Sequence, residues 1–205
     1  MLNNMFRYIF IPAMALVLSM LILGYVQKTS FGKWLSGEGA EQEVKIGGYF
    51  ELTNHKGELV KATDFRDNYM LVYFGFTSCA HICPVDIATI SDVMEKLTPP
   101  ETEILWPLFI TIDPERDSPA KMADYLSSFN PKIQGLTGDK EAISNVLKNY
   151  KVYANKQKGE DAENYDMDHS GYMYLMGKDG RYLTHFRHGQ SSDEIVKGIR
   201  KHINS

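Results

Sequence analysis

Cysteine is scarce in this chain, and an excess of positive charge is absent. Two cysteines in 205 residues exclude a disulfide-dense scaffold and any four-cysteine zinc site. The formal net charge is −4, and the charges through residue 43 cancel, so the rest of the chain offers no basic field to a phosphate backbone. Hydrophobic residues at 43% and charged residues at 23% exclude a disordered or collagen-like chain. Without repeats or low-complexity tracts, the expected product is a globular domain that does not bind nucleic acid.

One stretch near the amino terminus has no charge at all. Residues 8–26 (YIFIPAMALVLSMLILGYV) would span about 29 Å as a helix, close to the hydrocarbon thickness of a bilayer, about 30 Å. The alternative is a cleavable signal peptide, which has a shorter apolar core and a small-x-small cleavage site. Only weak cleavage candidates such as residues 30–32 follow the run, and no cysteine follows for a lipoprotein anchor. We therefore expect an uncleaved transmembrane anchor.

The charges on either side of this anchor give only weak evidence for its orientation in the membrane. Arg7 and the terminal amine precede the apolar run, whereas Lys28 and Lys33 lie just beyond its far end. The short amino-terminal stub favours translocation of the larger carboxy-terminal part. We expect a single-pass protein of the bacterial inner membrane with its domain in the periplasm. The predicted segments are a stub and anchor over residues 1–27, a Gly- and Glu-rich linker over residues 28–43, and one domain over residues 44–205.

Strand and helix patterns alternate through the predicted domain. Continuous apolar runs and hairpin-like turns mark the strands, and apolar spacings of three and four mark the helices. Ser118 with Pro119 is expected to open one helix, and Ser192 to cap the last one. This alternation predicts an α/β fold with a mixed sheet flanked by helices. The expected strands cover residues 49–52, 58–61, 69–74, 105–112, 172–176 and 182–187, and the expected helices cover 84–97, 118–129, 139–150 and 192 onward.

The two cysteines are four residues apart at the start of a predicted helix. Cys79 and Cys83 follow the buried strand at residues 69–74, which is the thioredoxin-like arrangement. One helical turn puts both sulfurs on one face, and free N–H groups at a helix start favour thiolates. Such thiolates can bind a soft metal or close into a disulfide. The alternative is a structural disulfide or two inert thiols, although a loop this short is a poor staple.

Two thiolates alone make an incomplete metal site, so the histidines are the next candidates. His55 in the first hairpin turn and His202 in the last helix are expected at the surface. His185 and His188 do not share a strand face, and His81 between the cysteines is expected to point outward.

The sixth histidine, His169, lies between a polar loop and a strand. A histidine in such a place is more often exposed than a ligand, and sequence spacing alone cannot bring it to the cysteines.

Four stretches together resemble the Sco/SenC family of membrane-anchored, thioredoxin-like copper proteins. They are LVYFGFTSCAHICP (71–84), FITIDPERDSP (109–119), GLTGD (135–139) and YDMDHSGYMYLMGKDG (165–180), in the family's order. The combination of CxxxCP with DHS far downstream is the specific part. The resemblance implies a copper site of two thiolates and one imidazole, here Cys79, Cys83 and His169. It also implies delivery of copper to the dinuclear copper centre of cytochrome c oxidase, or reduction of the cysteines of that centre.

The implied ligands suit copper better than zinc. Two thiolates and an imidazole match soft Cu(I), with Cu(II) as a second state, and three-coordination leaves room for a partner's ligand. Zinc normally takes a fourth ligand. Ala80 and His81 stand where family members often have proline and an acidic residue. A neutral His81 would favour the thiolates less and a protonated one more, and it could also act as a transient ligand.

Neighbouring residues of the expected site have two interpretations each. Asp168 could orient His169 or be an ordinary loop carboxylate. A thioether ligand from Met167, Met173 or Met176 is a further hypothesis. At least Met173 is better explained by strand packing.

Two further elements lie beside the expected site. The run Asp-Pro-Glu-Arg-Asp at residues 113–117 is either a loop that docks the partner or a turn locked by an Arg–carboxylate pair, and the lock is the preferred interpretation. Gly75 is expected to allow a tight bend after the strand. Phe74 and Phe76 beside it are expected to shield the metal.

Three functions remain in competition. The first is a copper metallochaperone whose partner is the copper-bearing subunit of the oxidase or another copper-delivery protein. The second is an enzyme, a thiol–disulfide oxidoreductase, with Cys79 and Cys83 as its redox pair. It does not need His169, and CxxxC differs from the CxxC on which thioredoxin-type redox poise depends. A peroxidase-like thiol enzyme is the third and weakest. We favour the chaperone.

Overall fold

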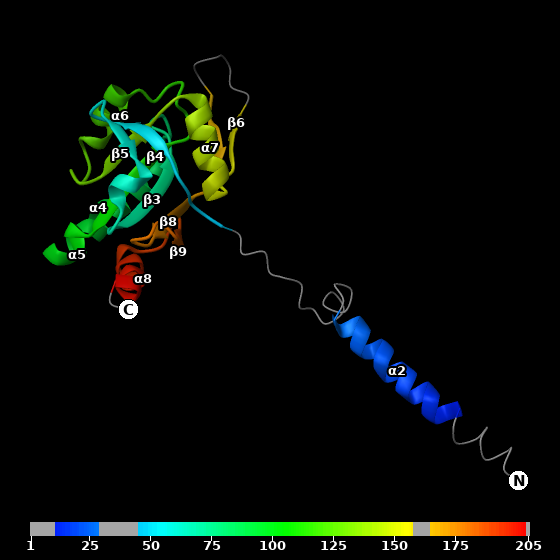
Figure 1. Ribbon diagram of the computed structural model, residues 1–205. Coiled ribbons are helices and arrows are strands. Elements are labelled where there is room, and N and C mark those ends of the chain that lie inside the picture. Colours follow the sequence, from blue (N-terminus) through cyan, green and yellow to red (C-terminus); the bar gives the residue numbers. More distant parts are fainter. Residues whose placement is uncertain (1–10, 29–44, 158–164, 204–205) are drawn as a thin grey trace, which may run out of the picture. The chain divides into compact units, whose positions relative to one another are not determined.

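The computed structural model describes residues 11–28, 45–157 and 165–203 (Figure 1). The chain divides into two units, Met1–Val44 and Lys45–Ser205. Most of the predicted linker over residues 28–43 lies outside the described residues. The proposed segment limits of 1–27, 28–43 and 44–205 therefore stay predictions.

Helix α2 (Ile11–Lys28) is the described element of the first unit, and it overlaps the stretch at residues 8–26 that was expected to form an anchor. Its side chains from Met14 to Tyr25 are all exposed, so none of its faces is covered. Among the residues that the structure describes, no helix reaches the combination of length and apolarity needed to cross a membrane. The anchor thus stays a prediction.

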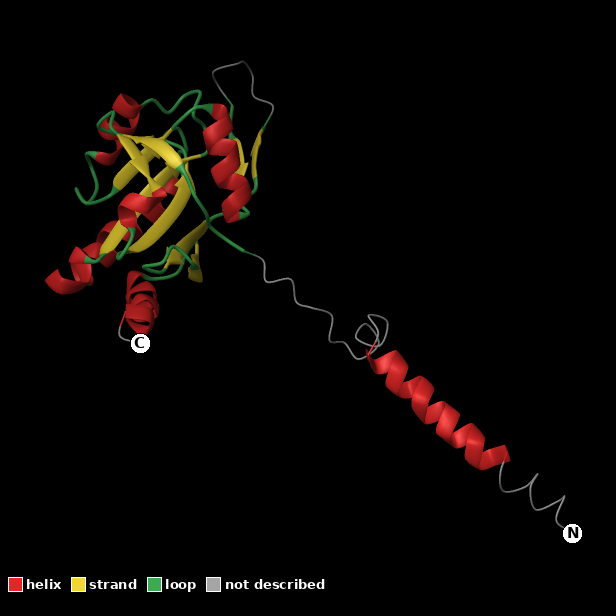
Figure 2. Ribbon diagram, viewed as in Figure 1, coloured by secondary structure: helices red, strands yellow, loops and turns green. Residues whose placement is uncertain are grey.

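A seven-stranded mixed sheet forms the centre of the second unit (Figure 2). Its strand order is β2-β1-β5-β4-β3-β8-β9. Strands β3, β4 and β5 run parallel, and antiparallel pairs extend the sheet on both sides. This arrangement confirms the mixed sheet expected from the sequence. The strands are β1 (Glu51–Asn54), β2 (Leu59–Lys61), β3 (Tyr69–Gly75), β4 (Leu105–Thr111), β5 (Gln134–Thr137), β8 (Tyr172–Met176) and β9 (Tyr182–Arg187).

Short polar side chains cap the free N–H groups at the start of α6, α7 and α8. Ser118 accepts the N–H of Lys121 ahead of the first helical proline, as expected. The last helix differs from expectation, because Ser191 and Glu194 bond reciprocally in a capping box one residue earlier than the predicted Ser192. The helical elements are η2 (Ala62–Phe65), α4 (Ile82–Lys96), α5 (Pro99–Glu103), α6 (Pro119–Leu126), α7 (Lys140–Tyr150) and α8 (Ser192–Ile203).

Consecutive side chains of β3 show which helix covers which face of the sheet. Tyr73 stacks on Phe109 of β4, which contacts Tyr125 of α6. Phe74 points to the opposite face and packs against Tyr150 of α7 at 5.2 Å between ring centroids. Because both faces are covered, six of the seven residues of β3 are buried, as its continuous apolar run predicts.

A separate two-stranded ribbon lies beside this sheet. Strand β6 (Ala154–Lys156) pairs antiparallel with β7 (Met167–His169), and Ala154 is opposite His169. The sequence pattern did not predict this ribbon. Only two residues separate β7 from β8, so the ribbon fixes His169 close to the start of β8.

Candidate metal centre

The cysteine loop connects the end of β3 to the start of α4. Cys79 precedes the helix and is partly buried, whereas Cys83 lies in its first turn with 0% of its surface exposed. Both are free thiols. The backbone N–H of Cys83 donates to the Sγ of Cys79 at 3.5 Å. A backbone N–H in the first turn of α4 therefore contacts the more accessible of the two sulfurs.

His169 approaches the buried sulfur from the ribbon. Its Nε2 lies 3.7 Å from Cys83 Sγ, although 86 positions separate the two residues in the chain. Its Nδ1 lies 3.2 Å from the carbonyl oxygen of Ser170. The ring also packs edge-on against Phe76, with centroids 6.1 Å apart. These contacts orient the imidazole with Nε2 toward the cysteine.

Burial sets the protonation of this pair. Burial raises the pKa of Cys83 to about 12, and the backbone of Phe76 partly opposes this effect. Burial also lowers the pKa of His169, against the smaller raising effect of Ser170. At neutral pH the pair is therefore a thiol beside a neutral imidazole. An arriving cation would favour loss of the thiol proton, which is how metal binding releases protons.

The spacing of the pair fits a shared first-row metal ion. Metal–sulfur and metal–nitrogen bonds of about 2.3 Å and about 2.0 Å together span up to about 4.3 Å, so one ion could contact both atoms. The observed separation is 3.7 Å. Among the described residues, no group of three or more His, Cys, Asp or Glu side chains has metal-holding geometry. The structure therefore pairs Cys83 with His169, and Cys79 lies beside them without completing a triad.

An open cleft of about 680 Å³ lies over the pair and gives access to the site. It lies between the cysteine loop and the segment that carries His169. Cys79 lines it, whereas the buried Cys83 does not appear in its wall. A molecule in this cleft would meet the sulfur of Cys79 first. The histidine, aspartate and arginine side chains in its wall are His81, Asp166, Asp168, His169, Arg187 and His188.

Comparison with known proteins identifies the family. The SCO1/SenC family model matches residues 38–204. This chain belongs to the SCO1/SenC family. A SCO2-like protein of Rickettsia felis is similar to it, with 42% identity over 161 residues that cover 78% of each chain.

Solved structures support the same relationship. The structure of Bradyrhizobium japonicum ScoI with copper bound is 37% identical, has a TM-score of 0.71, and covers 76% of this chain and 98% of its own. Yeast Sco1 with copper bound is 33% identical, has a TM-score of 0.73, and covers 78% of this chain and 90% of its own. These similarities confirm the thioredoxin-like Sco fold.

This Sco/SenC chain has a second paired histidine that the sequence analysis missed. His188 Nδ1 lies 2.8 Å from Asp86 Oδ1, and Asp86 is 1% exposed. Asp86 is three residues after Cys83 and therefore lies on the same face of α4. Two histidines from other elements therefore contact this face of α4: His169 lies beside Cys83, and His188 pairs with Asp86. A buried Asp on an otherwise apolar helix face was the available signal in the sequence.

Four other residues considered in the sequence analysis differ in their exposure to solvent. His81 is exposed immediately before α4, as expected. Asp168 is exposed on β7, and the contact to the His169 ring comes from Ser170 instead. Met173 is 1% exposed, which confirms its role in strand packing. Met176 is also buried, so neither is available as a surface thioether ligand.

The remaining histidines lie away from the cysteines. His55 was expected at the surface but is partly buried, because its Nδ1 accepts the N–H of Gly135 at 3.0 Å. His185 contacts the hydroxyl of Tyr182, and His202 lies in the last turn of α8.

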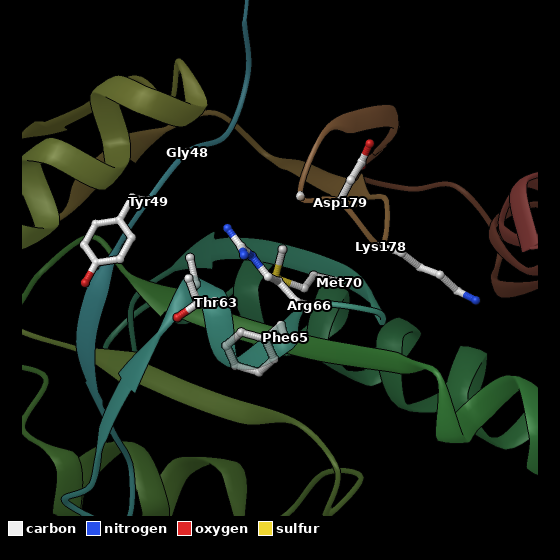
Figure 3. Close-up of a pocket in the computed structure, with 10 residues that line it drawn as sticks. Gly48, Tyr49, Thr63, Phe65, Arg66, Met70, Lys178 and Asp179 are labelled. Carbon is white, nitrogen blue, oxygen red and sulfur yellow. The ribbon is translucent and has the colours of Figure 1, made fainter.

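A different hollow, of about 210 Å³, lies away from the cysteine loop (Figure 3). Figure 3 shows Arg66 and Met70 between Tyr49 and the turn at Lys178 and Asp179. The described residues that line it include no cysteine or histidine. It therefore offers neither a thiolate nor an imidazole and is not part of the candidate metal centre.

Proposed function

We propose that this chain is a copper metallochaperone that delivers copper to the dinuclear copper site of cytochrome c oxidase, with Cys79, Cys83 and His169 as its ligands. The carrying observation is the 3.7 Å approach of His169 Nε2 to Cys83 Sγ. A thiol reductase has no need of this imidazole, whereas a copper site does. The relatives from Bradyrhizobium japonicum and yeast, solved with copper bound, support copper as the cargo.

The accessibility of the two sulfurs suggests the order of transfer. Cys79 lines the open cleft, and Cys83 has no exposed surface. A partner's thiolate would reach the metal beside Cys79 and displace that ligand first, while Cys83 and His169 still hold the ion. The partner in this proposal is the copper-bearing subunit of the oxidase or another copper-delivery protein. Soft Cu(I) moves readily along such a series of thiolates.

The second candidate is a thiol–disulfide reductase for the same target. It is favoured by the 3.5 Å contact from the Cys83 N–H to the Cys79 sulfur, which supports Cys79 as the attacking thiolate. Attack on a partner's disulfide would release one partner thiolate and form a mixed disulfide. Cys83 would then attack Cys79 and release the second partner thiolate. Two electrons pass to the partner, and a Cys79–Cys83 disulfide remains.

The proposal includes a place for the protein. We propose a single-pass protein of a bacterial inner membrane with its copper domain in the periplasm. Its support is the uncharged run at residues 8–26, together with the uncovered apolar side chains from Met14 to Tyr25. In this location the domain would face the same compartment as the copper-bearing part of a membrane oxidase.

His169→Ala separates the two candidates. Two thiols suffice for disulfide exchange, so this variant should still cycle between dithiol and disulfide in thiol-trapping assays. Copper binding should weaken by more than the 10- to 100-fold that loss of an orienting partner typically costs. In a deletion strain, the chaperone predicts lost oxidase activity at low copper and recovery with added copper. The exposed His185→Ala is the matched control and should retain full activity.

The contrary result is equally clear. Full oxidase activity of His169→Ala at low copper would reject the chaperone and support the reductase.

In the same strain, the parent should stay in the membrane pellet after a carbonate wash and be cut by external protease in spheroplasts. Recovery of a shortened soluble protein would instead support signal cleavage.

A further inference from the structure

The turn at residues 113–117 contacts the cysteine loop through Asp117. This carboxylate has 0% exposure and accepts from the N–H of Thr77 at 3.0 Å. It also accepts from the hydroxyls of Thr77 and Thr111. Thr77 lies two residues before Cys79. A buried carboxylate with several donors is a rigid anchor, so the start of the cysteine loop is fixed to this turn.

The same turn contacts the segment that carries His169 through Arg116. Its Nε pairs with Asp113, which is the lock favoured by the sequence analysis. Its Nη1 donates to the carbonyl oxygen of Tyr165 at 3.0 Å, and its guanidinium carbon lies 3.6 Å from the centroid of the Tyr165 ring. The Tyr165 hydroxyl in turn donates to Asp113 at 2.7 Å. These contacts close a ring of three side chains four residues before His169.

An aromatic contact joins the two attachments. The Arg116 guanidinium lies 5.7 Å from the centroid of the Phe76 ring. Phe76 packs edge-on against the His169 imidazole, and its backbone oxygen accepts the N–H of Cys79 at 3.3 Å. One planar cation thus contacts an aromatic ring from the cysteine loop and another from the histidine segment.

We propose that Asp113, Arg116 and Asp117 form a positioning element that sets the spacing between the cysteine loop and His169, with Arg116 as its central residue. The inference rests on the proposed copper function and adds residues that do not themselves touch the metal. Arg116 suits the role because its flat fork bonds in two directions while its face covers aromatic rings. Loss of Arg116 would leave all three ligands in the chain but release the imidazole from its place opposite Cys83.

A double-mutant cycle between Arg116 and His169 tests this proposal. Cu(I) affinity would be measured by competition with a chelator in the full chain for the parent, Arg116→Ala, His169→Ala and the double variant. Arg116→Ala should weaken binding about 10- to 100-fold in the parent but less than about threefold when His169 is already absent. Cu K-edge absorption should show loss of the nitrogen ligand with both sulfurs retained.

Glu115→Gln is the matched control from the same turn. Glu115 forms an exposed ion pair with Lys140 at 2.7 Å and should be dispensable for copper affinity. If Arg116→Ala does not fold, Arg116→Lys repeats the cycle, since it keeps the charge but loses the two-directional fork.

Arg116→Ala could weaken Cu(I) binding equally in the parent and in the His169→Ala variant. That result would indicate a general structural effect and would overturn the positioning role but not the ligand assignment. An Arg116→Ala variant that binds Cu(I) as tightly as the parent would also overturn the positioning role alone. If His169→Ala itself binds copper as tightly as the parent, the ligand assignment in the proposed function falls, and the positioning role falls with it.

Discussion

At the scale of single residues, Gly75 shows how closely the core packs against Cys83 in the candidate metal centre. The sequence suggested that this glycine permits a tight bend after the strand. It is instead the last residue of β3, and its backbone is not in the left-handed region. An added Cβ would lie 2.8 Å from Cys83 Sγ and 2.9 Å from the Phe109 ring. The glycine is therefore needed for close approach, and it leaves room for the sulfur.

Gly75→Ala should disturb stability and the site together. The extra methyl group must push the Cys83 sulfur or the Phe109 ring, at a cost of about 1–3 kcal/mol in the free energy of unfolding. Displacement of the sulfur should also weaken Cu(I) binding. Urea unfolding of the copper-free chain and chelator competition measure the two effects.

Gly171→Ala is the control for this prediction, because its added Cβ would meet only the Cβ of His188 at an ordinary 3.5 Å. It should change neither quantity appreciably. If Gly75→Ala matches the parent in both assays, the close packing behind Cys83 does not constrain the site.

At the scale of elements, an ion pair joins α5 to α8. Arg200 donates to the Glu101 carboxylate through Nε at 2.8 Å and through Nη2 at 3.0 Å. The Arg200 bonds, with help from the Thr98 N–H, lower the pKa of Glu101 to about 2. The folded state therefore binds this proton less readily than the unfolded chain, whose glutamate titrates near 4.5. The stabilisation is complete above pH 4.5 and disappears as the pH falls toward 2.

Arg200→Ala should expose this dependence. At pH 7 we expect a loss of about 1 kcal/mol in the free energy of unfolding, in the upper range for a partly exposed pair. The loss should shrink as the pH is lowered from 4.5 toward 2, because protonated Glu101 no longer pairs in the parent. Urea unfolding of the copper-free chain at several pH values provides the measurement. Lys197→Ala, an exposed cation on the same helix, should show neither effect, and a pH-independent loss for Arg200→Ala would contradict the account.

The sequence predicted some elements well because their signals are local. Continuous apolar runs located β3 and β4 to within one residue, and the hairpin at residues 178–180 located β8 and β9. Strand β5 was missed because it has four residues and a central glycine. The ribbon β6–β7 was missed because three-residue polar strands carry no alternation, and only their pairing stabilises them.

At the scale of the whole molecule, the site is a product of long-range contacts. Spacing alone identified Cys79 and Cys83. The choice of His169 required a family resemblance, because no local pattern links residues 86 positions apart. The Asp86–His188 pair spans 102 positions and was not predicted. Local chemistry therefore predicted the thiols, and the fold supplied the imidazole.

The most direct test of the central claim is Cu K-edge absorption on the full chain loaded with one equivalent of Cu(I). The account predicts two sulfur ligands and one nitrogen ligand in the parent, and loss of tight binding in both Cys79→Ser and Cys83→Ser. These variants leave one thiolate and one imidazole, which are too few soft ligands for tight binding. A spectrum without sulfur, or cysteine variants that hold one equivalent of copper as tightly as the parent, would contradict the account.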